Sequence, residues 1–238
     1  MYHTIKFWFI VTVLSIVLGV IAIFCRVWDS TGNTAHNIAR FWSLLLCELN
    51  GVKVEITGLE HVLKDRPQIF VANHQGFFDI FALSGYLPVQ MRWVAKSSLF
   101  HIPIVGWAMR AAGYISVKRE SRKQAYQAFL KTVDKVKSGC SIVIFPEGTR
   151  SLDGKIGPFK KGGHLLATRS AAPMVPVTII GTGAILKKGS LLFHPGAIRI
   201  IISPPMTAGN SKMQKGEVVL GKIRDTICAT YAANLGTN

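Results

Sequence analysis

The sequence predicts an α/β fold, in which a central, mostly parallel or mixed sheet is flanked by helices and preceded by an N-terminal membrane-associated helical hairpin. Three observations predict it. A long uncharged segment lies near the N-terminus, strand-like segments alternate with helix-like segments after residue 51, and 49% of the 238 residues are hydrophobic. Because a chain of this length and apolar content can bury a sizeable core, a disordered protein is excluded.

The uncharged segment is Phe7–Cys25, which is bracketed by Lys6 and Arg26. As a helix it would extend about 28 Å, close to the ~30 Å hydrocarbon core of a bilayer. The segment is longer than the apolar region of a signal peptide, and no small-residue cleavage site follows it. We therefore expect a helix that spans the membrane or is partly embedded in it, rather than a cleaved leader or a buried helix of a soluble protein.

A second helix is expected at residues 34–50, after a turn at residues 30–33. Its apolar side chains recur at the spacing of an amphipathic helix at the membrane interface; they are Ile38, Phe41, Trp42, Leu45, Leu46 and Leu49. The same pattern also fits a helix packed on the main domain. We interpret residues 1–50 as membrane-anchoring helices and residues 51–238 as the α/β domain.

After Gly51 the apolar pattern becomes strand-like and then alternates. Strands are expected at residues 52–57, 68–73, 91–96, 114–117, 141–146, 174–180 and 197–202, and helices at residues 78–86, 104–112, 122–137, 163–170 and 212–233. Such alternation predicts a sheet that is covered on both faces. Because ligands of such sheets bind beyond the carboxyl ends of strands, two polar clusters there, at residues 73–79 and 147–150, are candidate sites.

The charge and the cysteines narrow the classes of partner and compartment. With 28 Lys and Arg against 12 Asp and Glu, the net charge is 28 − 12 = +16, which favours a partner that carries phosphate, on nucleic acid or on lipid. The positive mean hydropathy, +0.33, favours lipid. The four widely spaced cysteines form no CxxC motif, so we expect free thiols in a reducing compartment.

His74, in the first cluster, is a candidate general base because imidazole titrates near neutral pH. A carboxylate that holds the ring and stabilises the imidazolium makes such a base more effective. Asp79 lies about 140° away from His74 around an ideal helix, so the two meet only if His74 lies in the turn before the helix. Gly76 permits that bend. The alternative interpretation of Asp79 is an acid that complements the helix dipole.

The second cluster, Phe145–Ser151, reads FPEGTRS. Pro146 ends the strand because it donates no hydrogen bond to a ladder, and Gly148 lets the backbone approach a ligand closely. The guanidinium of Arg150 is a planar donor suited to phosphate, and Glu147 can accept hydrogen bonds from hydroxyl groups. A strand-end turn with a salt bridge is the alternative interpretation of these residues.

Together the two clusters resemble the 1-acyl-sn-glycerol-3-phosphate acyltransferases of phospholipid synthesis. Four ordered blocks carry the resemblance: NHQGFFD at Asn73–Asp79, a KSSL segment at Lys96–Leu99 followed by Pro103 and Gly106-Trp107, FPEGTRS at Phe145–Ser151, and Val175-Pro176-Val177. The resemblance covers roughly residues 50–180 and, with the hairpin, most of the chain. These blocks are specific in combination.

One block departs from the family pattern. The family has a G-x-x-F-I-D-R stretch that aligns with Gly113–Arg119. Arg119 is kept, but the phenylalanine becomes Ser116 and the aspartate becomes Lys118. Since the resemblance associates this block with the acyl acceptor, the departure bears on the identity of the acceptor rather than on the type of reaction.

The resemblance implies transfer of a fatty acyl group from acyl-CoA or acyl carrier protein to the sn-2 hydroxyl of lysophosphatidic acid, which forms phosphatidic acid. His74 would be the general base and Asp79 would hold its ring. The implied substrate-binding residues are Glu147, Gly148, Thr149, Arg150, Lys96, Arg119 and Lys160. Because a thioester is already activated, no metal and no other cofactor is expected. Another lysolipid or glycerol-3-phosphate is the alternative acceptor.

Other classes fit the sequence less well. Neither a G-x-S-x-G elbow nor a complete P-loop occurs. A nucleic-acid-binding protein would leave Phe7–Cys25 unexplained, and a non-catalytic membrane protein would tolerate loss of His74. The expected partners are therefore lysophosphatidic acid, the acyl donor and a phospholipid membrane, without nucleic acid. Free thiols and cytosolic thioesters favour the cytoplasmic face of a bacterial inner membrane.

Overall fold

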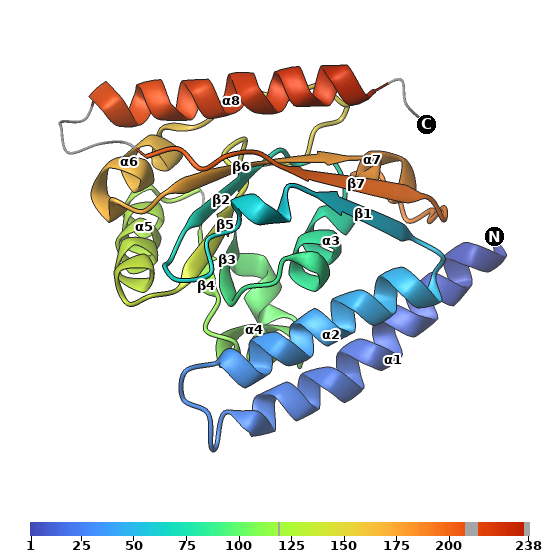
Figure 1. Ribbon diagram of the computed structural model, residues 1–238. Coiled ribbons are helices and arrows are strands. Elements are labelled where there is room, and N and C mark those ends of the chain that lie inside the picture. The colour runs from blue at the N-terminus through green and yellow to red at the C-terminus, as the bar shows by residue number, and fades with distance from the viewer. Residues whose placement is uncertain (119, 208–213, 236–238) are drawn as a thin grey trace.

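The computed structural model describes residues 1–118, 120–207 and 214–235 (Figure 1). Within them, one sheet has the strand order β1-β7-β6-β2-β5-β3-β4. Neighbouring strands run parallel except β6 and β7, which are antiparallel, so the expected mostly parallel, mixed sheet is confirmed. The strands are β1 (Lys53–Thr57), β2 (Ile69–Ala72), β3 (Met91–Lys96), β4 (Ile115–Val117), β5 (Ser141–Ile144), β6 (Met174–Ile180) and β7 (Ala197–Ile202).

Helices cover both faces of the sheet. Figure 1 shows α8 above the sheet and the hairpin of α1 and α2 below it. The helices are α1 (Tyr2–Cys25), α2 (Asn33–Leu49), α3 (Phe78–Tyr86), α4 (Val105–Ala111), α5 (Arg122–Lys137), α6 (Lys161–Ser170), α7 (Thr182–Ile185) and α8 (Gln214–Asn234), with short 3-10 turns η1 (Leu59–His61) and η2 (Ser97–His101). Of the last expected helix, residues 212 and 213 lie outside the described residues.

Two apolar clusters separate these layers. Along β2, the side chains of Phe70 and Ala72 join the cluster on the hairpin side, together with α2 and α3. Those of Ile69 and Val71 join the other cluster, together with α5, α6 and α8. This alternation follows from the two-residue period of a strand, and it explains why β2 is apolar throughout.

The hairpin packs directly on the α/β domain. Phe7 of α1 is fully buried, and its ring stacks on that of Phe193 with 4.6 Å between centroids. Further along α1, a Cβ atom on Gly19 would lie 2.7 Å from Ile104 Cγ2, so glycine allows the close approach of α1 to the start of α4. The segments interpreted from the sequence as two domains therefore share one core.

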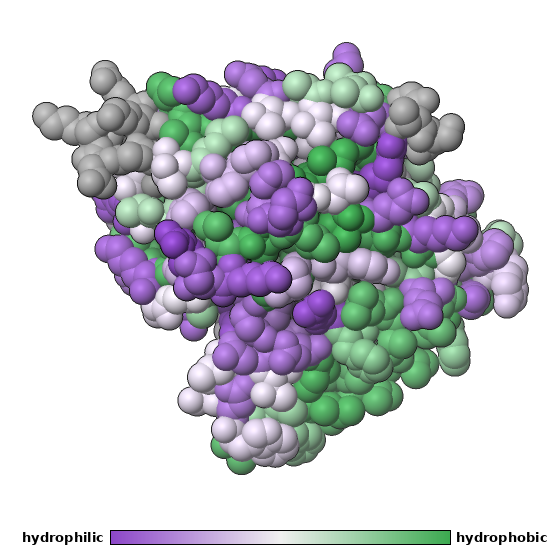
Figure 2. Space-filling view, viewed as in Figure 1, coloured by the Kyte–Doolittle hydropathy of each residue, from purple (hydrophilic) through white to green (hydrophobic). Residues whose placement is uncertain are grey.

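The opposite face of α1 is apolar and exposed. By length and composition, α1 is the one helix among the described residues that could cross a membrane. Figure 2 shows a hydrophobic surface over the hairpin at the lower right of the view. An exposed apolar surface of this extent marks a site of interaction with a membrane or an apolar partner. The exposed residues of this face are Ile5, Phe9, Val13, Ile16, Val17, Val20, Ile21 and Phe24.

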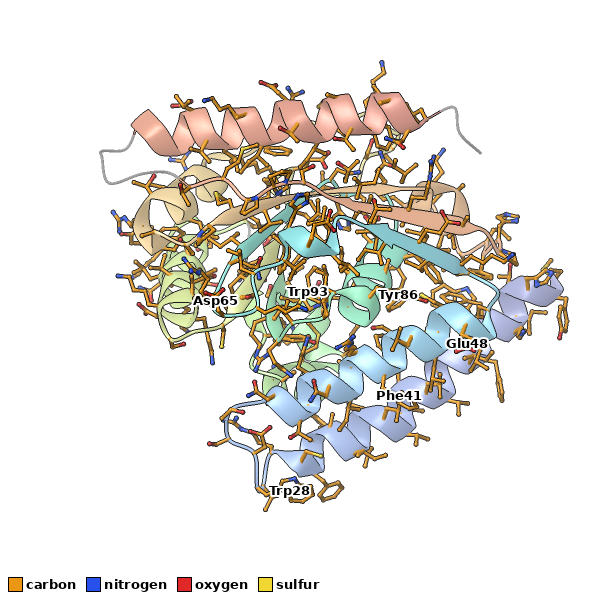
Figure 3. The ribbon with its side chains drawn as sticks, in the orientation of Figure 1. Trp28, Phe41, Glu48, Asp65, Tyr86 and Trp93 are labelled. Atoms are coloured by element: carbon orange, nitrogen blue, oxygen red, sulfur yellow. The ribbon has the colours of Figure 1, made fainter. Side chains whose placement is uncertain are left out.

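The second helix of the hairpin is packed on the domain along one face. Trp42 meets Phe81 of α3 edge-on, with ring centroids 5.0 Å apart, and Leu46 is fully buried. Phe41 in α2 and Trp28 in the turn, both labelled in Figure 3, are 52% and 71% exposed. The packed-helix interpretation therefore holds for Trp42 and Leu46, while Phe41 and Trp28 add aromatic side chains to the exposed surface of the hairpin.

Helix α2 carries a buried histidine that contacts the residue before β4. His36 is 1% exposed, and its Nδ1 atom lies 3.0 Å from the hydroxyl of Tyr114. Burial, together with the positive charges of Arg92 and Arg40, lowers the pKa of His36 from 6.5 to about 3. The ring is therefore neutral in the folded protein at neutral pH.

Acidification is expected to destabilise the fold through His36. The unfolded chain protonates this histidine near pH 6.5, whereas the folded chain keeps it neutral down to about pH 3. Between these values the unfolded state binds more protons than the folded state. The free energy of unfolding therefore decreases as the pH is lowered, by at most about 1.4 kcal/mol per pH unit. Thermal unfolding in detergent should therefore depend less on pH, between pH 7 and 5, in His36→Leu than in the wild type. Equal slopes would contradict this assignment.

Candidate active site

The two polar clusters expected from the sequence meet at the carboxyl ends of β2 and β5, which are neighbours in the sheet. His74 lies in the turn after β2, and Asp79 lies in the first turn of α3. His74 Nδ1 is 2.6 Å from Asp79 Oδ2, and the two side chains are 14% and 0% exposed. Because an ionised carboxylate only accepts hydrogen bonds, Nδ1 carries the proton and Nε2 is left as an acceptor.

Four hydrogen-bond donors converge on the buried carboxylate of Asp79. The backbone N–H groups of Gln75 and Gly76 donate to Oδ2 at 2.7 and 3.0 Å, in addition to His74. The hydroxyl of Thr182, in α7, donates to Oδ1. Burial of a carboxylate is tolerated when its oxygens are satisfied in this way. Since Asp79 also lies in the first turn of α3, its position suits the helix dipole as well.

Two further contacts fix the turn that carries His74. The side chain of Asn73 exchanges two hydrogen bonds of 2.8 Å with the backbone of Ile179 in β6. A Cβ atom on Gly76 would lie 2.3 Å from the backbone oxygen of Thr182, so only glycine fits at this position. The turn that carries His74 is therefore held by contacts with β6 on one side and with α7 on the other.

The structure gives Glu147 a positioning role. It is 7% exposed, and its two carboxylate oxygens accept from the backbone N–H groups of His74 and Gly157, each at 2.8 Å. Burial raises the pKa of Glu147, and the two hydrogen bonds oppose the rise. Both oxygens thus bind the protein's own backbone, and the contact with the substrate that the resemblance implies stays a prediction.

An aromatic surface supports the imidazole. The ring of Phe145 stacks on that of His74 with 3.9 Å between centroids and an angle of 9° between planes. Trp93 of β3, labelled in Figure 3, stacks on Phe145 at 5.6 Å. The plane of the imidazole is therefore fixed by stacking as well as by its hydrogen bond to Asp79.

Arg150 and Thr149 gather with a lysine that the sequence did not single out as a site residue. Lys188 Nζ donates to Thr149 Oγ1 at 2.9 Å and to the backbone oxygen of Arg150 at 3.1 Å. The Arg150 guanidinium lies over the ring of Phe77, 5.8 Å from its centroid. Because Phe77 belongs to the turn that carries His74, the positive charges of Arg150 and Lys188 lie beside the candidate base.

The other candidate binding residues lie around this centre. Gly148 has a φ of 73°, and a Cβ atom on it would lie 2.8 Å from Lys160 Nζ, so Lys160 crosses this turn. Lys96 ends β3 on the same edge of the sheet, where its ammonium lies 3.7 Å from Glu120. Arg119 lies outside the described residues. In the described ranges, no three His, Cys, Asp or Glu side chains gather as a metal site.

A histidine–aspartate pair at the carboxyl edge of an α/β sheet, beside an apolar hairpin, defines a protein equipped for proton transfer next to an apolar surface. Its family follows from comparison with known proteins. The chain belongs to the acyltransferase family, whose model matches residues 53–180. This match includes both polar clusters and β1 to β6.

Individual proteins match beyond these residues. The chain is 39% identical to the chloroplastic 1-acyl-sn-glycerol-3-phosphate acyltransferase BAT2 of Brassica napus over 174 residues, 72% of this chain and 50% of that protein. It is 32% identical to the 1-acyl-sn-glycerol-3-phosphate acyltransferase of Pseudomonas aeruginosa, over 73% of this chain and 66% of that one. The chain spans about half the length of the relatives from Brassica napus, Arabidopsis thaliana and Chlamydomonas reinhardtii.

A solved structure matches nearly the whole fold. The crystal structure of the 1-acyl-sn-glycerophosphate (LPA) acyltransferase PlsC from Thermotoga maritima superposes with a TM-score of 0.79 at 28% identity. The match covers 96% of this chain and 95% of that one. It therefore includes the hairpin as well as the sheet.

Proposed function

We propose that this chain transfers a fatty acyl group from an acyl thioester to the sn-2 hydroxyl of lysophosphatidic acid and so forms phosphatidic acid. One observation carries the proposal. His74 is held through Nδ1 by a buried aspartate, and its Nε2 has no hydrogen-bond partner among the described residues. The proposal is supported by the relatives in Brassica napus and Pseudomonas aeruginosa, which are named 1-acyl-sn-glycerol-3-phosphate acyltransferases.

The proposed reaction needs one general base. Nε2 of His74 takes the proton of the hydroxyl as the hydroxyl oxygen attacks the thioester carbonyl carbon. The tetrahedral intermediate then collapses, the C–S bond breaks, and the leaving sulfur takes the proton back from the imidazolium. Asp79 keeps the ring in place and stabilises the imidazolium that forms. Because the thioester is already activated, we propose no metal or other cofactor, and acyl-CoA or acyl carrier protein is a co-substrate.

The positive charges beside His74 suit the phosphate of the acceptor. In lysophosphatidic acid the phosphate lies a few bonds from the attacked hydroxyl, so its binding groups must lie close to the base. Arg150 can offer a planar pair of donors. Lys188, which donates to Thr149 and to the backbone of Arg150, adds a second positive charge. Lys160 and Lys96 lie further around the site, and Arg119 is a further candidate from the sequence.

We further propose that the chain works at a membrane surface, at the cytoplasmic face of a bacterial inner membrane. The exposed apolar face of α1 supports membrane contact, since α1 is attached to the domain along its other face and would lie partly embedded. The net charge of +16 favours an anionic leaflet. The cytoplasmic side is supported by the four free cysteines, and the bacterial membrane by the relative in Pseudomonas aeruginosa.

Two charged substitutions on the exposed face of α1 are expected to weaken membrane binding. The double variant Phe9→Glu, Ile16→Glu should bind vesicles of anionic phospholipid at least about tenfold more weakly, because two exposed apolar side chains lose their transfer into lipid. Val218→Glu is the matched control, because Val218 is 56% exposed on α8, across the sheet from the hairpin. Cosedimentation measures both. Equal binding by the double variant and the wild type would rule out this face as the membrane contact.

The proposed activity is tested with purified protein in detergent. Lysophosphatidic acid and palmitoyl-CoA or palmitoyl carrier protein are supplied, and phosphatidic acid is measured by mass spectrometry. We expect phosphatidic acid with at least one donor. If only another lysolipid or glycerol-3-phosphate is acylated, the reaction type stands and the acceptor is wrong. If no acceptor is acylated by either donor, the proposal fails.

A further inference from the structure

A hollow lies beside β4, the edge strand opposite to β1 in the sheet. It encloses about 620 Å³, within the range of about 300–1,000 Å³ that is typical of small-molecule sites. Its walls come from η2 and α4 on one side and from the last turns of α5 on the other. Among the described residues that line it, none belongs to the cluster around His74.

The walls carry an excess of positive charge. Arg110 comes from α4, and Lys131 and Lys135 come from α5, while Asp134 is the one acidic residue in the described lining; His101 of η2 also lines the hollow. Within the described part of the chain, none of the three cations forms an ion pair. Uncompensated cations in a concave surface concentrate the positive potential and attract anions.

A buried guanidinium adds to this charge from beneath. At Gly113, on the floor of the hollow, a Cβ atom would lie 3.4 Å from Arg92 Nε and 3.7 Å from Lys135 Nζ. Arg92 is fully buried, and its Nη1 and Nη2 atoms donate to neutral oxygens of Gln90, Met91, Thr31 and Asn33, while Nε is left without a partner in the described residues. Because burial limits screening by solvent, this charge adds to the positive potential of the hollow.

We propose that this hollow binds the phosphate groups of the acyl donor, a coenzyme A thioester. The inference rests on the proposed function and adds the place where the donor is recognised. It assigns residues 113–116, which line the hollow, to the donor, although they begin the block that the resemblance associates with the acceptor. Ser97, the first residue after β3, lines the hollow, so the hollow reaches the edge of the sheet that carries His74. Its concave shape and size fit a nucleotide better than the convex face of a carrier protein.

The distance from the candidate base also favours the donor over the acceptor. The strand order β2-β5-β3-β4 places three strand spacings of about 4.8 Å, hence about 14 Å, between the strand before His74 and the strand that borders the hollow. Lys135 lies beside Gly113, before β4, whereas His74 follows the carboxyl end of β2, so the phosphates would lie further from the base than this sideways distance. Coenzyme A separates its thioester from its phosphates by the flexible pantetheine arm, which can cover such a distance. The phosphate of a lysolipid lies too close to its hydroxyl to do so.

Direct binding tests the site without turnover. Isothermal titration of the full chain in detergent with coenzyme A should give a dissociation constant that rises at least about tenfold in the double variant Lys131→Gln, Lys135→Gln. Asp134→Asn should tighten binding, and Lys135→Arg should retain it. Lys53→Gln is the control, since Lys53 is exposed on β1 at the other edge of the sheet. ADP should bind more weakly than coenzyme A, and the variants should have the same order of affinity for both ligands.

Kinetic measurements distinguish a site for the phosphates of coenzyme A from a site for the phosphate of a lysolipid. With palmitoyl-CoA as donor, the double variant should raise the KM for the donor by the same factor, with kcat and the KM for lysophosphatidic acid unchanged. Unaltered coenzyme A affinity in the double variant would overturn the proposal, and so would a selective loss of lysolipid or vesicle binding. Absence of coenzyme A binding to the wild type, with transfer from acyl carrier protein intact, would also overturn it while leaving the proposed function standing.

Discussion

Replacing His74 with alanine is expected to reduce the rate of acyl transfer by about 10²–10⁴-fold, because no other group in the described site is placed to take the proton of the attacking hydroxyl. The substitution removes the imidazole and leaves the backbone contacts in place. The N–H of residue 74 still donates to Glu147, and its carbonyl still accepts from the N–H of Ser151 at 2.8 Å. The turn should therefore persist without its base.

The measurement is initial rate against substrate concentration, with wild type and His74→Ala at equal concentration in the same detergent. The loss should fall on kcat, while the KM for the acceptor stays within a few-fold, since the residues assigned to its phosphate are untouched. Thermal unfolding should show that both proteins fold, with His74→Ala the less stable because Asp79 loses one of its four donors and Phe145 its stacking partner. A folded His74→Ala protein with the rate of the wild type would refute the assignment of the base.

Asp79→Asn is expected to cause a loss of similar size for a different reason. An amide has one acceptor oxygen and one N–H₂ group, whereas four donors converge on this side chain. If the amide nitrogen faces His74, Nδ1 must accept and the proton moves to Nε2, which then cannot act as the base. If it faces Thr182, the amide oxygen still accepts from His74, Gln75 and Gly76, and the Thr182 hydroxyl must rotate to accept from the amide. The first orientation gives an inactive tautomer, and the second leaves the imidazolium without a negative charge to stabilise it, so both predict a loss of rate.

Thr182→Val is the matched control for Asp79→Asn. It removes the one side-chain donor to Oδ1 and leaves the bond between His74 and Asp79 intact. We expect a decrease in stability of about 1–3 kcal/mol and a rate within tenfold of the wild type, because the base keeps its tautomer. A loss of rate in Thr182→Val as large as that in Asp79→Asn, with both proteins folded, would show that the carboxylate acts through the architecture of the turn alone.

Much of this fold could be predicted from local sequence pattern. The buried strands β2, β5 and β6 are short apolar runs that end in turn residues, and α5 has a clear apolar face closed by Ser138-Gly139. The short elements η1, η2 and α7 have no such period, because a single turn gives too few residues to form one. The packing of α1 on the α/β domain was not predicted, because the contact of Phe7 with Phe193 joins distant parts of the chain, which a local pattern does not report.

The candidate site was predictable where its residues are close in sequence. His74 and Asp79 are close in sequence, at a turn and the helix start that follows it, so their spacing alone predicted that they could pair. Thr182 and Lys188 reach the site from beyond β6, and only the tertiary structure brings them there. The role of Glu147 depends on two backbone N–H groups, and backbone partners of a side chain leave no trace in residue types.

The stacking of Phe7 on Phe193 also has a consequence for the order in which the hairpin and the α/β domain fold during synthesis. Phe7 leaves the ribosome well before Phe193, the partner that covers it, because the two are 193 − 7 = 186 residues apart in the chain. At about 5–20 residues per second, this interval is about 10–40 s. For that time the apolar helix emerges without its docking surface. If the hairpin binds the membrane as proposed, it therefore meets the lipid before the α/β domain folds against it, and delivery to the bilayer precedes folding.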